Sequence, residues 1–520
     1  MASSIIQKWP RGRIRKSSCP MVHRANLWID FAGFRSELFR SGMKLAVSLL
    51  TLMSASSRLS AQSAKISYAD LLRPPGHTYH HVPIGLCEDY PEESTTPAII
   101  RGDMELLKRS GIKLLRIAFG WDGIEGKKGA YDWLFWDDYV KMAVDEYGIT
   151  LIPYICYTPR WNSTGDSTNY WNHTPKDYEA FGAFVLTIVG RYKDRIHSWE
   201  LWNEPDISAF WSGTAEELAR LTKIGSQAVK KADPDAIVVL AGLAGNTRFT
   251  EALFKDYGIS PYVDVVNIHN YYETWNSTPI EAIVDEVNTV HDIVKRFGRN
   301  QSIWMAEVGY SSFRKPDGYV SDWSWSTYAY EHTAEYQAVH LIKALTLDLS
   351  TERLAAVAWY RIKDLKPGEA VIGDVNNRFL GVARLDHTPK PAEKAITFFN
   401  RMFSQSYRCI DRQTVVRRTL GSDSEVHTFE IEDGSVVIVG WLKTRIPGRA
   451  GNEPIGTLED RRRETVTLTL PKKLAGGGVL YDELGSGHAF TEIDNGGPAT
   501  VVSGLILDGG AISILKLVPK

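Results

Sequence analysis

The stretch that decides the fold reads "IHSWELWNEPD" and covers residues 196–206. It runs from apolar, strand-like residues into Asn203 and Glu204, and Pro205 follows directly. Buried strands usually end in small or turn-forming residues, so a carboxylate at this point needs a chemical reason. Proline fixes φ and turns the chain away, which leaves both polar side chains projecting from the end of the strand.

Seven further apolar runs resemble this one, and amphipathic helical stretches separate them. Continuous apolar runs, rather than alternating ones, are typical of parallel strands that are covered on both faces. The eight runs are residues 81–86, 112–119, 149–156, 196–202, 236–242, 263–269, 302–308 and 355–361. This rhythm predicts an α/β fold, a (β/α)8 TIM barrel, over residues 65–403. A doubly wound open sheet is the alternative, but no Gly-rich phosphate loop follows any run.

Residues typical of helix starts and helix ends support the prediction of helices between the runs. Thr96-Pro97 and Thr174-Pro175 each place a cap residue before a proline at the first helical position. Thr214 and Glu217 have the spacing of a capping box. Glycines stand where helices are expected to end, at Gly111, Gly148, Gly258 and Gly298.

The pattern changes after residues 388–403, which have the character of the last barrel helix. Short β-type runs separated by Gly, Asp and Asn turns follow it, at residues 425–431, 435–442, 464–470, 478–484 and 511–517. We therefore expect a β-sandwich-like domain over residues 404–520.

The N-terminal region has the pattern of a secretory signal. In residues 43–64, Lys44 precedes a short apolar run, and small residues follow as far as Ala64. We interpret Met43 as the true start, residues 1–42 as an upstream extension without a structural role, and the mature protein as secreted or periplasmic. The apolar run is too short to span a bilayer, so no membrane insertion of the mature form is expected. A basic tail on a cytosolic protein is the alternative.

Composition excludes some partners. Lys and Arg number 60 and Asp and Glu number 62, which gives no electrostatic case for nucleic acid. The 4 cysteines match no zinc or disulfide spacing. The 16 Trp and 23 Tyr offer flat faces on which sugars can stack. Flat aromatic faces have many uses and sugar stacking is a prominent one, so a carbohydrate is a candidate partner. No metal and no cofactor are expected, and the sequence does not indicate an oligomeric state.

Two carboxylates stand at the ends of strands, where barrel active sites lie. Glu204 closes the fourth run and Glu307 closes the seventh, in "IWMAEV". A protonated and an ionised carboxyl group facing one cleft are the requirement of glycoside hydrolysis. Asn203, next to the acid, is placed to bind a sugar hydroxyl beside the anomeric carbon.

The motifs "WELWNEP" and "WMAEVGY" resemble those of glycoside hydrolase clan A, and the similarity covers roughly residues 80–400. In that clan the glutamate of Asn-Glu-Pro is the acid/base and the strand-seven glutamate is the nucleophile. The resemblance implies these roles for Glu204 and Glu307. Within the clan, "YTPRW", the stretch leading into "WELWNEPD" and "DHTPKPAEKAITFF" are most similar to family 39, with family 5 as the runner-up.

The same resemblance implies other site residues. Arg116 matches the clan's arginine beside the nucleophile, which would keep Glu307 ionised. His269 and Tyr271 match a His-x-Tyr motif whose histidine lines the sugar site and whose tyrosine binds the nucleophile. Trp359 resembles the platform under the reacting sugar.

The end of the third run departs from the clan, because many members have a histidine there. Here the chain reads "YICYTPRW", so Tyr157 or Trp161 would take that place. The loop after the seventh run holds Trp323 and Trp325, which we interpret as a wall of the substrate site, with an ordinary packed lid as the alternative.

Together these features predict a retaining glycoside hydrolase that cleaves β-linked O-glycosidic bonds of an oligosaccharide or polysaccharide through a covalent glycosyl-enzyme intermediate. Two alternatives remain. A barrel that binds sugars without catalysis would keep the aromatic residues, and a transglycosylase would use the same carboxylate pair.

Overall fold

The computed structural model describes residues 66–72, 79–89, 95–316, 318–319, 321, 328–368, 371–419, 423–444 and 460–520. Residues 65–520 form one compact unit. The predicted upstream extension, residues 1–42, and the predicted signal, residues 43–64, lie outside the described residues. Trp323 and Trp325 also lie outside them.

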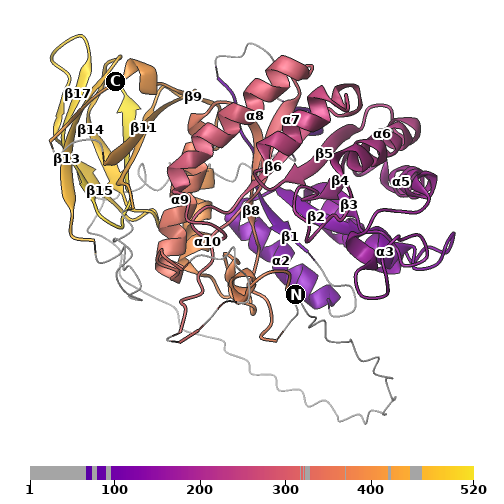
Figure 1. The fold of residues 1–520 in the computed structure, drawn as a ribbon. Helices are drawn as coiled ribbons and strands as arrows, with labels where there is room; N and C mark the ends of the chain where they lie inside the picture. Colours follow the sequence, from indigo (N-terminus) through magenta and orange to yellow (C-terminus); the bar gives the residue numbers. More distant parts are fainter. Residues whose placement is uncertain are drawn as a thin grey trace, which may run out of the picture. The chain divides into compact units, whose positions relative to one another are not determined.

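Eight parallel strands close into a barrel, as predicted (Figure 1). Each strand pairs with the next one in sequence, and β1 pairs with β8 to complete the ring. This closure excludes the open-sheet alternative. The strands are β1 (Ile84–Glu88), β2 (Leu114–Gly120), β3 (Thr150–Cys156), β4 (Ser198–Asn203), β5 (Ile237–Leu243), β6 (Val265–Asn270), β7 (Ser302–Val308) and β8 (Leu354–Tyr360).

Helices surround the barrel (Figure 1). They are α2 (Pro97–Ser110), α3 (Trp121–Ile124), α4 (Leu134–Val140), the π-helical turn η2 (Lys141–Glu146), α5 (Tyr178–Tyr192), α6 (Ala215–Ala232), α7 (Thr247–Lys255), α8 (Ile283–Phe297), α9 (Ala334–Ser350) and α10 (Pro391–Met402). Among the described residues, no helix has both the length and the apolar character needed to cross a bilayer.

The caps at Thr96 and at Thr214 with Glu217 are confirmed. The predicted helix start at Thr174-Pro175 is wrong. The Thr174 carbonyl oxygen instead accepts a hydrogen bond from the Thr164 amide, at 3.0 Å, and holds this segment in a loop. Helix α5 begins three residues later, where the Asp177 side chain caps it.

The barrel interior is apolar at the end where the strands begin. Side chains from six strands fill it, and a short 3-10 helix, η1 (Tyr68–Leu71), packs against it. The Trp304 indole Nε1 donates to the Leu71 carbonyl oxygen at 2.7 Å, which ties η1 to β7. Because this end is filled with apolar side chains, the polar residues of the interior gather toward the opposite end, where the strands terminate.

The C-terminal domain consists of two antiparallel sheets, and the predicted β-sandwich is confirmed. One sheet has the order β10-β13-β17-β16 and the other β15-β14-β18-β12-β11-β9. The bounds are β9 (Tyr407–Cys409), β10 (Val415–Arg418), β11 (Ser424–Ile431), β12 (Val436–Leu442), β13 (Arg463–Leu470), β14 (Leu474–Tyr481), β15 (Gly487–Phe490), β16 (Ile493–Asp494), β17 (Thr500–Asp508) and β18 (Ser513–Pro519). The predicted runs correspond to β11, β12, β13, β14 and β18; sequence reasoning missed β9, β10, β15, β16 and β17.

The two domains share contacts. The ring of Phe403, just after α10, packs edge-on against Tyr407 and Phe429 of the sandwich. The Trp441 indole Nε1 donates to Glu281 Oε1 at 3.0 Å. The predicted domain border between residues 403 and 404 thus falls in a packed junction between α10 and β9.

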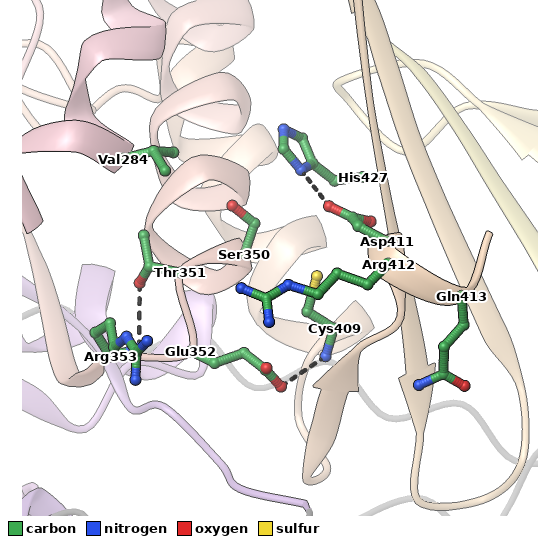
Figure 2. Close-up of a pocket in the computed structure, with 10 residues that line it drawn as sticks. All are labelled: Val284, Ser350, Thr351, Glu352, Arg353, Cys409, Asp411, Arg412, Gln413 and His427. Atoms are coloured by element: carbon green, nitrogen blue, oxygen red, sulfur yellow. Dashed lines mark hydrogen bonds and ion pairs between the residues drawn. The ribbon is translucent and has the colours of Figure 1, made fainter. Parts of the chain in front are cut away.

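A cavity of about 540 Å³ lies at this junction (Figure 2). Figure 2 shows Arg412 reaching from the C-terminal domain toward the turn at residues 350–353. Polar groups around the cavity bond one another: Glu352 Oε1 accepts from the Cys409 amide at 2.9 Å, and Asp411 Oδ2 lies 2.8 Å from His427 Nδ1. None of the predicted site residues that the structure describes lines this cavity, so it belongs to the domain junction.

Candidate active site

The structure brings Glu204 and Glu307 together at the C-terminal ends of β4 and β7. One oxygen of each carboxyl group and one ring nitrogen of His269 lie within 4.8 Å of one another. Both glutamates are buried, at 7% and 8% exposed. Retaining glycosidases hold their carboxyl groups about 5–5.5 Å apart, whereas inverting enzymes need about 6.5–9.5 Å to admit a water. The separation fits the retaining geometry.

The backbone at Glu204 is unusual. Its φ is 42°, in the left-handed region that non-glycine residues rarely adopt. The Glu204 amide donates to the Gly242 carbonyl oxygen of β5 at 2.8 Å, which holds the turn in place. Such a conformation costs about 1–3 kcal/mol and persists only where surrounding contacts enforce it. The turn that Pro205 completes therefore presents the Glu204 side chain in one fixed direction.

Glu307 has three polar neighbours. Arg116 Nη1 donates to Glu307 Oε2 at 2.7 Å, Tyr271 donates its hydroxyl to Glu307 Oε1, and His269 Nδ1 lies 3.4 Å from Oε2. The expected contacts of Arg116 and Tyr271 with Glu307 are thus present. Burial raises the pKa of Glu307 to about 6, although His269 and Arg116 act to lower it. Arg116 limits the effect of burial on this carboxyl group but does not overcome it.

Arg116 also contacts a carboxylate that sequence reasoning missed. Its Nε and Nη2 each donate to Glu200 at 2.9 Å, and Nη2 donates to Asn203 Oδ1 at 2.8 Å. The guanidinium lies 4.1 Å from the centre of the Tyr154 ring and is almost fully buried. The contact with Oδ1 orients the Asn203 amide, so that its nitrogen faces away from the guanidinium.

Glu204 is held in the protonated form at neutral pH. Burial raises its pKa to about 8, and the negative charge of Asp206 is the next cause. Asp206 Oδ1 and Oδ2 accept hydrogen bonds from the Ala244 and Asn246 amides, each at 3.0 Å. Asp206, two residues after Glu204, therefore places a second negative charge beside the acid and helps to keep it protonated.

His269 lies between the two carboxyl groups. Its Nδ1 is 2.9 Å from Glu204 Oε1, and the ring is fully buried. Burial lowers the pKa of His269, so the imidazole is neutral near pH 7. Its expected position at the site agrees with the structure, where it faces Glu204 as well as Glu307.

The prediction that Trp359 is a sugar platform is wrong. Its side chain is fully buried in the layer between strands and helices, with the ring of His340 from α9 at 6.3 Å. Side chains alternate along a strand, so Trp359 points outward and its neighbour Tyr360 points inward. Tyr360 packs against Tyr271 at the inner face, with ring centres 6.1 Å apart. The strand-eight aromatic residue next to the site is therefore Tyr360.

The charges of site carboxylates act on Tyr157, whereas the contacts of Trp161 lie with a neighbouring loop. Burial raises the pKa of the Tyr157 hydroxyl, and the charges of Asp89 and Glu204 contribute. The Trp161 indole donates to the Glu125 carbonyl oxygen at 2.7 Å and packs edge-on against Trp121. Among the residues that the structure describes, these contacts direct Trp161 toward the loop after β2.

Asp89, after β1, adds a further carboxylate to the site. Its Oδ1 accepts from the Tyr154 hydroxyl at 2.6 Å and its Oδ2 from the Tyr360 hydroxyl at 3.0 Å. Its negative charge contributes to the raised pKa of Glu204 and of Glu307. Two tyrosines from different strands thus hold Asp89 in a fixed position near the catalytic pair.

One signal would have found two interior residues that sequence reasoning missed, Glu200 and Asn267, whose Nδ2 donates to Glu200 Oε1 at 3.0 Å. Glu200 in "WELW" and Asn267 in "VVNIH" are polar side chains inside otherwise apolar strands. A buried polar group is retained only when it has partners, so each implies an interior hydrogen-bond network. Weighing only residues at the very ends of strands excluded both.

Comparison with known proteins identifies relatives of most of the barrel. The sequence model of glycosyl hydrolases family 39 matches residues 99–422, which is more than half of the chain. A β-xylosidase from Geobacillus stearothermophilus is 22% identical over 335 residues, covering 58% of this chain and 61% of that protein. The chain therefore spans about three-fifths of the length of this relative.

Solved structures share the fold. A family 39 glycoside hydrolase from Bacteroides cellulosilyticus WH2 superposes with a TM-score of 0.61 at 17% identity, covering 84% of this chain and 81% of that chain. A monomeric β-xylosidase from Caulobacter crescentus CB15 gives a TM-score of 0.57 at 17% identity, with coverages of 84% and 96%. At these identities the likeness is one of architecture.

Proposed function

The chain belongs to glycosyl hydrolases family 39, and on this premise we propose that it is a retaining β-glycosidase acting on O-glycosidic bonds of an oligosaccharide or polysaccharide. Glu204 is the acid/base and Glu307 is the nucleophile. The observation that carries the proposal is the approach of one Glu204 oxygen and one Glu307 oxygen to within 4.8 Å, in two carboxyl groups whose pKa values are raised to about 8 and about 6. Such a pair supplies one acid and one base near neutral pH.

In the first half-reaction, the Glu307 carboxylate attacks the anomeric carbon while Glu204 gives its proton to the glycosidic oxygen. The C–O bond to the leaving group breaks, the aglycone departs as an alcohol, and a glycosyl ester forms on Glu307. Arg116 and the Tyr271 hydroxyl hold the nucleophile in position. The Asn203 amide nitrogen is available for the neighbouring sugar hydroxyl, because Arg116 occupies Oδ1.

In the second half-reaction, Glu204 accepts a proton from water, whose oxygen attacks the anomeric carbon and releases Glu307. Ionised Glu204 raises the pKa of Glu307, and this interaction is mutual. Esterification removes the charge of Glu307, which makes ionisation of Glu204 easier when a base is needed. Two inversions at one carbon give overall retention of configuration.

Retention is the direct test. Proton NMR of a β-glycoside digest should show the β-anomer of the free sugar first and the α-anomer only as mutarotation proceeds. Aryl β-xylosides are the first substrates to try, because relatives and structural neighbours include β-xylosidases. Initial appearance of the α-anomer would contradict the double-displacement mechanism.

Two other functions use the same residues. A transglycosylase would transfer the glycosyl group from Glu307 to a sugar hydroxyl, and product analysis at high acceptor concentration separates this outcome from hydrolysis. A sugar-binding barrel without catalysis would bind glycans and release no product across a broad panel. The raised pKa of Glu204 favours the catalytic proposals, because binding alone needs no protonated glutamate.

The pH profile of kcat/KM is expected to be bell-shaped. The active free enzyme needs Glu307 ionised and Glu204 protonated, and their pKa values are about 6 and about 8. Activity should therefore fall below about pH 6 as Glu307 gains a proton, and above about pH 8 as Glu204 loses one. Initial rates at low substrate concentration measure the profile, and an optimum below pH 5 would contradict these assignments.

We also propose that residues 43–64 direct export of the protein to the periplasm or the exterior. Support comes from Lys44, the apolar run of residues 45–53 and the small residues that end at Ala64. N-terminal sequencing of the mature protein should show a start near residue 65. A mature protein that retains Met1 would contradict export by this segment.

A further inference from the structure

Asn267, in the interior of β6, connects the site to the polar groups beneath it. We propose that Asn267 is a positioning residue that locks neutral His269 in the tautomer with hydrogen on Nδ1, so that the catalytic proton of Glu204 resides on Oε2. The hydrogen-bond part of this inference rests on the geometry and on the neutral state of the buried His269 ring, and its kinetic consequence rests on the proposed function. Each step follows from which atoms can donate and which can accept.

The orientation of the Asn267 amide is determined by two fixed neighbours. Its Oδ1 accepts from the Ala306 amide at 3.0 Å, and its Nδ2 donates to Glu200 Oε1 at 3.0 Å. A flipped amide would place nitrogen against the Ala306 N–H and oxygen against the Glu200 carboxylate. Both contacts would be repulsive, so only one orientation is possible.

The second hydrogen of Asn267 Nδ2 points at His269 Nε2, which is 3.3 Å away. An amide nitrogen cannot accept a hydrogen bond, so Nε2 must be the acceptor of this pair. A neutral imidazole carries one hydrogen, and the hydrogen of His269 is therefore on Nδ1. From there it is directed at Glu204 Oε1, at 2.9 Å, with Glu307 Oε2 farther away at 3.4 Å.

The tautomer of His269 also determines which oxygen of Glu204 carries the proton. Because Glu204 Oε1 faces a donor, it must be the carbonyl-type oxygen of the protonated carboxyl group. The proton then resides on Oε2, from which it can be given to the glycosidic oxygen. In the opposite tautomer Nδ1 would be an acceptor, Glu204 would donate its proton to His269, and the acid would be directed away from the substrate.

Packing against β5 holds the His269 ring in this orientation. A Cβ atom at Gly242 of β5 would lie 2.0 Å from His269 Nε2, so the ring occupies space that only glycine leaves open. The Gly242 amide also donates to Glu200 Oε1 at 2.7 Å. Arg116 and the backbone of β5 hold the Glu200 carboxylate in place. Glu200 in turn orients the Asn267 amide.

Kinetics with two aglycones test the role of Asn267. Asn267→Leu keeps the approximate volume but removes both donors, which frees His269 to take either tautomer. We expect kcat/KM for phenyl β-glycosides to fall about 10²-fold, the lower end of what general acid catalysis contributes. For 2,4-dinitrophenyl β-glycosides, whose leaving group needs no proton, the fall should stay within about 3-fold.

Asn270→Leu is the matched control, because it removes another buried amide of β6. That amide donates to Glu286 Oε2 and not to His269. Any loss in this variant should be equal for the two aglycones, which is the signature of a purely structural effect. Equal losses for both aglycones in Asn267→Leu, or no loss for either, would overturn the proposal.

Neutron diffraction of the wild-type protein at pH 7 locates the protons directly. Deuterium on His269 Nδ1 and on Glu204 Oε2, with none on His269 Nε2, is the expected result. Deuterium on His269 Nε2, alone or together with Nδ1, would overturn the tautomer assignment and leave the proposed glycosidase function intact. Failure to hydrolyse any β-glycoside would contradict the proposed function and leave the proton positions unaffected.

Discussion

Replacing Glu307 by alanine is expected to reduce kcat by roughly 10⁴–10⁶-fold, the range seen when a covalent nucleophile or its partner is removed. Without the carboxylate no glycosyl ester can form, and water has no preorganised route to the anomeric carbon. The variant should remain folded, because Arg116 keeps its two hydrogen bonds to Glu200 and its contact with Asn203. Steady-state kinetics on an aryl β-glycoside measure the loss.

Azide should then rescue the Glu307→Ala variant, because the small anion fits the space that the carboxylate leaves. A single displacement would give a glycosyl azide of inverted, α configuration. The matched variant Glu204→Ala keeps the nucleophile, so azide should resolve its glycosyl ester and give the β-glycosyl azide from a dinitrophenyl substrate. Product NMR distinguishes the two anomers. An α-azide from Glu204→Ala with none from Glu307→Ala would reverse the two roles.

Replacing Arg116 by methionine is expected to lower the free energy of unfolding by about 3–5 kcal/mol, the cost of leaving buried charges without their partner. Arg116 forms ion pairs with Glu200 and Glu307, and the side chains of Arg116 and Glu200 are 1% and 2% exposed. Arg195→Met is the control. Arg195 pairs with Asp145, and these two side chains are 45% and 40% exposed, so their ion pair should contribute less than about 1 kcal/mol to the free energy of unfolding. Urea denaturation of both variants measures the difference.

The same variant should shift the acid limb of the pH profile. Arg116 acts to lower the pKa of Glu307, so without its charge the pKa should rise above its value of about 6. The acid limb then moves to higher pH, and activity at pH 6 falls more than activity at pH 7.5. If the acid limb of the variant lies at the same pH as that of the wild type, Arg116 has no electrostatic influence on Glu307.

Strand order and strand ends could be predicted because they depend on local pattern. The run at residues 302–308 was expected and β7 occupies the same residues, so Glu307 stands at a strand end as predicted. The helix before β4 was placed three residues early, because a Thr-Pro pair also suits a loop. Among the C-terminal strands that escaped detection, β17 is the longest, and Gly504 in its middle interrupts the β-type pattern.

The direction of a side chain is harder to predict than the strand that carries it. Trp359 and Tyr360 are adjacent in sequence, and an error of one residue exchanges the inner and outer faces of β8. Apolar character cannot resolve this, because both faces of a barrel strand are buried. The structure places Trp359 against α9 and Tyr360 beside Tyr271.

By itself the sequence determined the barrel, the sandwich and the two strand-end glutamates, because each follows from periodicity and from residue types that are close in the chain. Only the tertiary structure decided the further groups that act on those glutamates. Asp206 acts on Glu204 through a turn, Glu200 acts on Glu307 through Arg116, and Asn267 acts on Glu204 through His269. Hydrogen bonds and charges operate over a few ångströms of space. Which distant residues come within that range is set by the closure and register of the barrel.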